Sequence, residues 1–332
     1  MPSEKDIVEG INYKAPQKEL WTGRKTNPSI GNQYWYQEIQ FFKANNLAKG
    51  GERIKLPDVA LLGYACDEGV RRNMGRVGAK EGPVSFRKKI ASLPFHHGAI
   101  SVGDFGDILC SDQDMENSQN VLSNVVKQLI SSSIFPIVIG GGHDLAYAHF
   151  GGIKNAVRST GKSKIGIINF DAHFDLRPVD EKSNSGTPFN QILSESNDVD
   201  YLVVGLQKQS NTKELFNIAK TNNVQYIENF DCVFSNIEVV KSTLLQFIER
   251  NDYIYLSIDL DGFSSAYAPG VSAPSPLGFS PMFAFDLIRL IMESKKVVSC
   301  DIAELNPLFD VDNATSILAA RLADFIISCR LG

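Results

Sequence analysis

The sequence lacks the features that mark several large classes of protein. It has five cysteines among 332 residues, and no two of them form a Cys-x-x-Cys pair. An odd number of scattered cysteines argues against a disulfide framework or a zinc ribbon and favours a reducing compartment, so we expect a cytoplasmic protein. Cys300 lies in an apolar run, where we expect a buried structural thiol.

Long apolar runs and a strong charge imbalance are also absent. No uncharged stretch reaches the roughly 18 residues that a membrane-spanning helix needs. The first residues do not have the charged-then-apolar order of a signal peptide. The net charge is −5 at pH 7, so no global positive field would attract nucleic acid or an anionic membrane. We expect a globular protein whose partners are neither nucleic acids nor membranes.

After residue 55 the chain alternates between short apolar runs and amphipathic stretches. The apolar runs are rich in β-branched residues, as expected for strands buried on both faces. They are Val59–Tyr64, Ile100–Val102, Ile134–Ile139, Ile165–Phe170, Tyr201–Val204, Val224–Ile227, Tyr253–Leu260 and Val297–Ile302. Helical patterns between them include Met115–Ile130, Glu238–Glu249, Pro281–Met292 and Asn313–Cys329. The alternation predicts a parallel sheet with helices on both sides and a ligand site beyond the carboxyl ends of its strands.

The first 55 residues are different in character. They are polar and mixed, with Trp21, Trp35 and Tyr36 as isolated aromatic anchors. We therefore expect an N-terminal extension, residues 1–55, that packs on a main domain, residues 56–332. A charged helix is predicted around residues 34–45.

Three of the predicted strands run directly into residues with metal-binding side chains. These continuations are Gly140-Gly141-Gly142-His143-Asp144, Asp171-Ala172-His173-Phe174-Asp175 and Asp259-Leu260-Asp261-Gly262. In an extended chain every second side chain points the same way, so the polar residues of each segment would project together. Four carboxylates cannot share a cleft unpaired, and two divalent cations would balance them. Oxygen-rich ligation with one imidazole per metal suits Mn²⁺.

Each segment taken alone has a plainer interpretation. An Asp-x-Asp at a strand end is often a turn or a helix cap, and with the following glycine it also suits a phosphotransferase-type or calcium loop. The glycine run alone would suit a phosphate-binding turn, although it lacks the Gly-x-Gly-x-x-Gly spacing of dinucleotide-binding proteins. In this order the three segments favour a binuclear metal site. We leave out His96 and His97, which lie in a loop, and His149, which we expect to pack inside a helix pattern.

In order and context the three segments resemble the ureohydrolase family, which includes arginase, agmatinase, guanidinobutyrase and formimidoylglutamase. The resemblance extends from about residue 56 to the C-terminus. It implies a three-layer α/β/α sandwich with a largely parallel eight-stranded sheet, two Mn²⁺ ions per chain and a homo-oligomer. The implied metal ligands are His143, Asp171, His173, Asp175, Asp259 and Asp261. Asp171 and Asp175, with one of the last two aspartates, would bridge or share the metals. Glu304 would hold the amidine or guanidine group of the substrate.

Several segments are closer to formimidoylglutamase than to arginase. These are Asp67–Asn73, Gly75–Ala79, Ser185–Phe189, Ser210–Thr212 and Ala266–Pro274. Arginases usually place a histidine at the position of Phe189, and an Asp-Pro after the metal aspartates, where this chain has Phe263-Ser264-Ser265. The resemblance thus implies a hydrolase that converts N-formimidoyl-L-glutamate to glutamate and formamide in histidine degradation.

Arg177 supports this substrate on physical grounds. It follows Asp175 by two residues, at the rim of the predicted site. A guanidinium can clamp a carboxylate with two charge-assisted hydrogen bonds, and formimidoylglutamate has two carboxylates. The alternative is a salt bridge from Arg177 to Asp180 or Glu181. The predicted substrate-binding residues are Arg177, Ser185, Asn211 and Arg72, with Arg76 as a further candidate. For Arg72 and Arg76 a role in stabilising the fold is the equal alternative.

The resemblance also implies a mechanism. A hydroxide bridging the two metals would attack the formimidoyl carbon, Glu304 would pair with the amidinium, and Asp175 would pass the proton to the departing amine. Two alternatives stay open. One is an arginase, agmatinase or guanidinobutyrase that releases urea, and the other is a catalytically silent metal-binding homologue.

Overall fold

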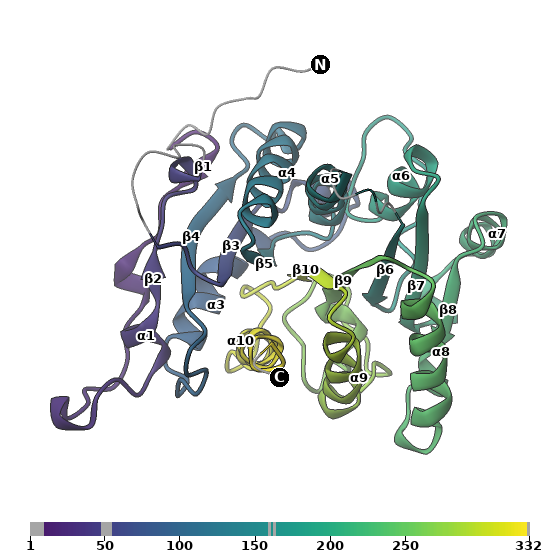
Figure 1. Ribbon diagram of the computed structural model, residues 1–332. Coiled ribbons are helices and arrows are strands. Elements are labelled where there is room, and N and C mark those ends of the chain that lie inside the picture. Colours follow the sequence, from purple (N-terminus) through teal and green to yellow (C-terminus); the bar gives the residue numbers. More distant parts are fainter. Residues whose placement is uncertain (1–9, 48–54, 159–160, 162–163, 331–332) are drawn as a thin grey trace.

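The computed structural model describes residues 10–47, 55–158, 161 and 164–330 (Figure 1). Its centre is one open sheet of ten strands within these residues, in the order β1-β4-β3-β5-β10-β9-β6-β7-β8, with β2 beside β4. The eight longer strands pair in parallel. They are β3 (Val59–Ala65), β4 (Val102–Leu109), β5 (Phe135–Gly140), β6 (Ile165–Phe170), β7 (Val199–Leu206), β8 (Gln225–Glu228), β9 (Tyr253–Asp259) and β10 (Val297–Ala303). This confirms the predicted eight-stranded parallel sheet.

Two strands of two residues each extend the sheet beyond that prediction. β1 (Tyr13–Lys14) pairs antiparallel with β4, and β2 (Gln40–Phe41) pairs parallel with it. The predicted helix around residues 34–45 is wrong, because α1 covers only Trp35–Glu38. The chain after it runs extended along β4, where the Phe42 ring stacks on Phe105 at 5.2 Å. Aromatic packing on the sheet edge thus replaces the expected helix.

Helices cover both faces of the sheet, so the three-layer architecture is confirmed (Figure 1). One face packs against α4 (Met115–Ser131), α5 (Leu145–Val157), α6 (Pro188–Glu195) and α7 (Lys213–Thr221). The other packs against α3 (Gly82–Ile90), α8 (Ile237–Glu249), α9 (Pro281–Glu293) and α10 (Ala314–Ser328). Asp114, Thr212 and Ser280 cap α4, α7 and α9 by accepting a backbone N–H of the first turn. No helix in the described ranges is long and apolar enough to cross a bilayer.

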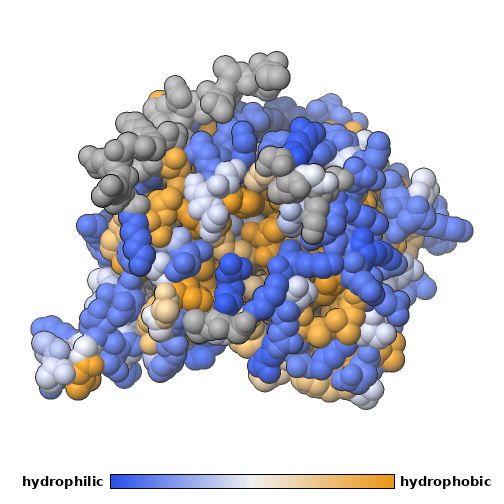
Figure 2. Space-filling model, viewed as in Figure 1, coloured by the Kyte–Doolittle hydropathy of each residue, from blue (hydrophilic) through white to orange (hydrophobic). Residues whose placement is uncertain are grey.

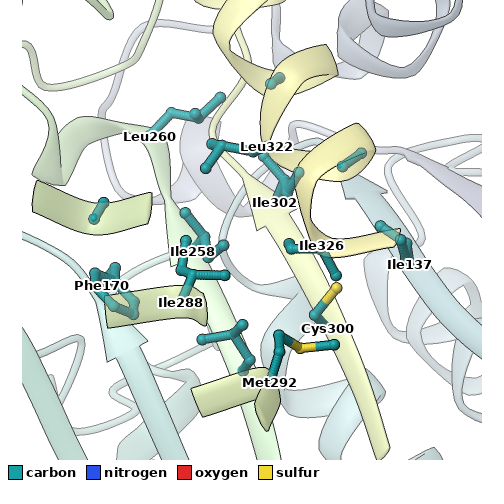
Figure 3. Packing of buried hydrophobic residues seen from close by; sticks show 14 of the residues in the cluster. Ile137, Phe170, Ile258, Leu260, Ile288, Met292, Cys300, Ile302, Leu322 and Ile326 are labelled. Carbon is teal, nitrogen blue, oxygen red and sulfur yellow. The ribbon is translucent and has the colours of Figure 1, made fainter. Parts of the chain in front are cut away.

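Two apolar cores follow from this layering, one on each side of the sheet. Figure 3 shows part of the core beneath α9 and α10, where Ile258 and Ile302 of the sheet lie against Ile288 and Ile326 of the helices. Cys300 is fully buried in the same cluster, as predicted. On the face seen in Figure 2, hydrophilic side chains cover most of the surface, and hydrophobic ones show in the centre and in patches along the lower part. The helices bury their apolar faces against the sheet, as expected for amphipathic helices.

The largest error in the strand predictions concerns β4. We predicted Ile100–Val102, but the strand runs from Val102 to Leu109 and contains two buried aspartates. The buried Arg87 of α3 pairs with Asp104 at 2.8 Å and with Asp107 at 2.6 Å. Because the single guanidinium and further hydrogen bonds hold both carboxylates inside the fold, the strand tolerates a pattern that looks like a loop in the sequence.

The N-terminal residues that the structure describes are tied to the main body by indole hydrogen bonds. Trp21 donates to Asp104 of β4 at 2.9 Å, and Trp35 donates to Asp324 of α10 at 2.8 Å. Both indoles are buried. The division of the chain at residue 55 itself stays a prediction.

Candidate metal centre

The centre of the sheet brings the three metal-binding segments together. β5, β10, β9 and β6 are consecutive neighbours and run parallel, so their carboxyl ends lie at one edge. His143 follows β5, Asp171 follows β6, Asp259 ends β9, and Glu304 follows β10. Residues far apart in the sequence therefore meet at this edge. For example, the backbone N–H of His143 donates to Oε1 of Glu304, 161 positions away, at 3.0 Å.

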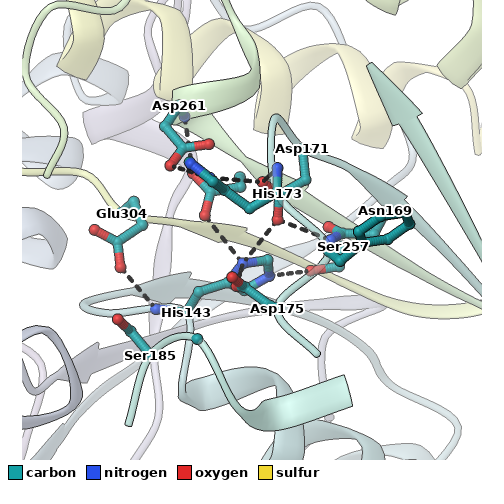
Figure 4. Close-up of polar contacts among 12 residues, drawn as sticks. His143, Asn169, Asp171, His173, Asp175, Ser185, Ser257, Asp261 and Glu304 are labelled. Carbon is teal, nitrogen blue, oxygen red and sulfur yellow. Dashed lines mark hydrogen bonds and ion pairs between the residues drawn. The ribbon is translucent and has the colours of Figure 1, made fainter. Parts of the chain in front are cut away.

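The six predicted ligands form two overlapping groups (Figure 4). In the first, His143 Nδ1 lies 3.3 Å from Asp171 Oδ2 and 3.0 Å from one oxygen each of Asp175 and Asp259. In the second, His173 Nδ1 lies 3.4 Å from Asp171 Oδ1 and 3.1 Å from Asp261 Oδ2. Asp171 belongs to both groups, one oxygen to each. Asp175 belongs to the first group alone, which does not suit the bridging position that the resemblance implied for it.

The segments that follow β6 and β9 turn tightly, whereas we predicted from the sequence that they continue as extended chain. Asp171 Oδ1 accepts the backbone N–H of His173 at 2.7 Å, and Asp259 Oδ1 accepts that of Asp261 at 2.8 Å. Asp175 has a φ of +48°, in the left-handed region that non-glycine residues seldom adopt. Glu304, with φ +63°, shares this feature. Strained backbone at two site residues is typical of functional sites, where surrounding contacts hold the conformation.

The carboxylates of the cluster repel one another, and bound cations would stabilise their charged forms. Burial and the neighbouring Asp171 carboxylate raise the pKa of Asp175 to about 6. Burial and the neighbouring Asp259 carboxylate raise the pKa of Glu304 well above its usual value. Burial opposes charge on His143, but contact with the surrounding aspartates outweighs it and raises the imidazole pKa well above its usual value. Three buried atoms of this cluster have no hydrogen-bond partner among the described residues: His143 Nδ1, Asp261 Oδ1 and Glu304 Oε2. Unpartnered nitrogen and oxygen atoms of this kind fit a pair of divalent cations, to which they would offer lone pairs.

A cavity of about 220 Å³ opens above the carboxylates. Its lining includes Asn73, Arg177, Ser185, Asn211, Ser272 and Glu304 together with the metal-binding residues. The volume suits a ligand of amino-acid size. Asn73 and Ser272 were not predicted, although both lie in segments that carry the family resemblance. Asn73 donates its amide to Ser185 Oγ at 3.1 Å, which orients the serine at the cavity wall.

Arg177 lies at the mouth of this cavity. Its backbone N–H donates to Gly186 O at 2.8 Å, and a Cβ on Gly186 would lie 2.9 Å from Arg177 Cδ. The glycine thus leaves room for the stem of the arginine. Among the described residues, the exposed guanidinium makes no hydrogen bond or ion pair, so the alternative of a salt bridge to Asp180 or Glu181 is not seen.

Two other predicted substrate contacts, Asn211 and Arg72, already bind groups within the protein. Asn211 accepts the N–H of Phe174 and donates to the carbonyls of Ala172 and Gln207, so its side chain braces the loop of metal ligands. Arg72 does not line the cavity. Its guanidinium pairs with Glu68 at 2.9 Å and Glu116 at 2.6 Å, which corresponds to the fold-stabilising alternative.

Two residues outside the cavity support His143. Phe189, considered above as a substrate-specificity position, is fully buried, and its ring meets the imidazole edge-on at 5.4 Å. Ser257 Oγ lies 2.9 Å from His143 Nε2. Neither role was predicted, because each depends on contacts between distant segments.

Comparison with known proteins gives a consistent result. The model of the Arginase family matches residues 57–328. A formimidoylglutamase of Geobacillus sp. (strain WCH70) is 41% identical over 310 residues, which cover 93% of this chain and 94% of the relative. A formimidoylglutamase of Clostridium tetani is 39% identical over 319 residues, or 94% of each chain. A crystal structure of Trypanosoma cruzi formiminoglutamase with Mn²⁺ superposes with a TM-score of 0.75 at 26% identity, covering 87% of this chain and 98% of that one. The chain therefore belongs to the arginase family.

Proposed function

We propose that this protein hydrolyses the formimidoyl C–N bond of N-formimidoyl-L-glutamate and releases glutamate and formamide. The observation that carries the proposal is the guanidinium of Arg177, which has no partner among residues 10–47, 55–158, 161 and 164–330 and lies at the mouth of a cavity floored by carboxylates. That cation offers a site for a substrate carboxylate, and the substrate has two. The curated relatives that cover more than nine-tenths of this chain bear the name formimidoylglutamase, which supports the same substrate.

We further propose that the cluster holds two Mn²⁺ ions. His143, Asp175 and Asp259 would hold one ion and His173 and Asp261 the other, with Asp171 contributing one oxygen to each. Carboxylate oxygens with one imidazole per ion suit Mn²⁺. When bound, such a pair of cations supplies hydroxide at neutral pH.

Glu304 would recognise the reacting end of the substrate. Its Oε1 is occupied by the N–H of His143, and its buried Oε2 is free among the described residues. Oε2 would accept an N–H of the formimidoyl group and stabilise its cationic amidinium form, which makes the carbon more electrophilic. Asp175, which also lines the cavity, would receive a proton there and deliver it to the departing amine.

The decisive experiment compares substrates on the Mn²⁺-loaded protein. Formimidoylglutamate, arginine, agmatine and guanidinobutyrate are incubated separately, and formamide and urea are measured. We expect formamide from the first and no urea from the others. Urea from a guanidine substrate would overturn the substrate assignment and keep the metal chemistry, whereas no product at full metal loading would support a catalytically silent homologue. Chelator-treated protein is the control.

The family resemblance also leads us to propose a homo-oligomer in the cytoplasm. Light scattering on the purified protein tests the first part, because a mass equal to one 36.6 kDa chain would contradict it.

A further inference from the structure

A chain of buried polar side chains leads from the metal centre into the sheet. His143 Nε2 lies 2.9 Å from Ser257 Oγ (Figure 4), and Ser257 donates to Asp301 Oδ1 at 2.7 Å. Ser257 of β9 and Asp301 of β10 are paired residues of neighbouring strands. Asp301 and Ser257 are completely buried, and His143 is 1% exposed. No water or surface group is therefore needed to complete this chain of contacts.

The single hydrogen of the serine hydroxyl determines the direction of these bonds. A carboxylate can only accept, so the hydroxyl hydrogen of Ser257 points to Asp301. Ser257 Oγ is then an acceptor toward the imidazole, and His143 Nε2 must carry a hydrogen. In a neutral imidazole the other nitrogen, Nδ1, is consequently free of hydrogen, and it is the nitrogen that faces the three aspartates.

Asp301 is itself held as an acceptor from the opposite side. Its Oδ2 accepts the Tyr255 hydroxyl and lies 2.6 Å from His149 Nδ1. His149 Nε2 lies 2.6 Å from Ser299 Oγ, which donates to the carbonyl of Pro136 at 3.0 Å. Because a carboxylate can only accept, His149 Nδ1 donates to Asp301.

We propose that Asp301 is a positioning residue that, through Ser257, fixes His143 in the tautomer and orientation needed to bind a metal through Nδ1. The proposal rests on the metal centre proposed above but not on the identity of the substrate. Packing alone would not call for this arrangement, since apolar side chains of similar volume would fill the same space without the desolvation of charged groups. Hydrogen-bonded partners of metal-binding histidines commonly set ring orientation in this way.

Asp301→Asn tests the proposal because it changes hydrogen bonding with almost no change in shape. Two donors, Tyr255 and His149, converge on Oδ2, so the amide oxygen of the variant will face them. Its NH₂ group will then face Ser257 and donate to it. The serine hydroxyl must now donate to His143 Nε2, which moves the ring hydrogen to Nδ1 and opposes metal binding. We expect the Mn²⁺ affinity of the His143 group to fall about 10- to 100-fold.

Two measurements report on this without enzyme activity. Competition with a chelator gives the affinity and number of bound Mn²⁺ ions. Nitrogen NMR of protein labelled in its five histidines and loaded with diamagnetic Zn²⁺ reports the state of each ring. In the natural protein His143 should show a liganded Nδ1 and a hydrogen on Nε2. In Asp301→Asn the Nδ1 signal should remain unliganded at Zn²⁺ concentrations that saturate the natural protein.

Ser257→Ala and Cys300→Ala separate positioning from general destabilisation. Ser257→Ala deletes the relay and should weaken Mn²⁺ binding, and adding Asp301→Asn to it should weaken binding little further. Cys300 is the neighbour of Asp301 on the opposite face of β10 and is equally buried. Cys300→Ala should lower the melting temperature and leave Mn²⁺ affinity within about twofold.

Three results would overturn the proposal. They are a liganded His143 in Asp301→Asn at ordinary Zn²⁺ concentration, unchanged Mn²⁺ affinity in Ser257→Ala, or an equal loss of affinity in Cys300→Ala. If Asp301→Asn does not fold, the Ser257→Ala result decides. Failure of the substrate assignment is distinguishable, because the substrate comparison uses the natural protein and these measurements need no turnover.

Discussion

Replacing Arg177 by alanine gives the sharpest test of the proposed substrate. The guanidinium lies at the mouth of the cavity and, within the described chain, has no partner to lose. Its removal should therefore change the free energy of unfolding by less than about 0.5 kcal/mol, as for other surface substitutions. If it binds a substrate carboxylate, however, that interaction disappears completely.

The size of the effect follows from the exposure of Arg177. A hydrogen bond to a charged group contributes about 1.5–3 kcal/mol. Because this guanidinium is exposed to solvent, binding replaces water contacts, and we take the lower part of the range, about 1.5–2 kcal/mol. At about 1.4 kcal/mol per factor of ten, KM for formimidoylglutamate should rise about 10- to 30-fold. Arg177 does not touch the reacting carbon in this arrangement, so kcat should change by less than about twofold.

Steady-state kinetics on the Mn²⁺-loaded protein provide the measurement, with formamide as the product followed. Arg177→Lys keeps the charge but loses the paired hydrogen bonds, so its KM should fall between those of the other two proteins. Arg321→Ala on α10 removes an equal, exposed charge away from the cavity and serves as the matched control. An unchanged KM in Arg177→Ala would refute the assignment, as would an equal rise in Arg321→Ala.

Three further predictions concern the metal centre and its support. Asp171→Asn should abolish binding of both Mn²⁺ ions, because Asp171 belongs to both ligand groups, whereas Asp261→Asn should leave one ion bound. Elemental analysis of the purified variants gives the number of bound ions per chain. Equal losses in the two variants would contradict the division into two groups. Mn²⁺ affinity should rise as the pH increases above about 6. The pKa of Asp175 is about 6 and the pKa values of His143 and His173 are raised, so protons must leave these groups before a cation binds. Calorimetry in buffers of different ionisation enthalpy would show this proton release, and a pH-independent affinity would argue against it. Phe189→Ala should lower the free energy of unfolding by about 3–5 kcal/mol, as for other buried phenylalanines, and it should weaken metal binding because the ring packs on His143. Denaturant titration measures the first effect and chelator competition the second. A loss of stability with unchanged metal affinity would limit the role of Phe189 to packing.

Much of the metal centre was readable from the sequence because its ligands are grouped locally. Asp171, His173 and Asp175 lie within five residues directly after an apolar strand, and Asp259 and Asp261 repeat the pattern. Most strands buried on both faces are nearly continuous apolar runs, so their ends are marked where polar residues resume, whereas β4 with its buried aspartates escapes this signal. The parallel sheet and the carboxyl-end location of the site follow from the same signal.

Only the tertiary structure decided which distant residues neutralise one another. Asp104 can lie inside β4 because Arg87 of α3 reaches it. Arg72 pairs with Glu116, whereas the Arg177 guanidinium has no partner in the part of the chain that the structure describes. The link from His143 through Ser257 to Asp301 spans two strands and joins residues far apart in the chain. Such pairings depend on strand order and register, which bring residues together regardless of their separation in the sequence. Local apolar patterning therefore determined where the strands end and which chemistry follows them, and long-range packing determined which charges remain free to act.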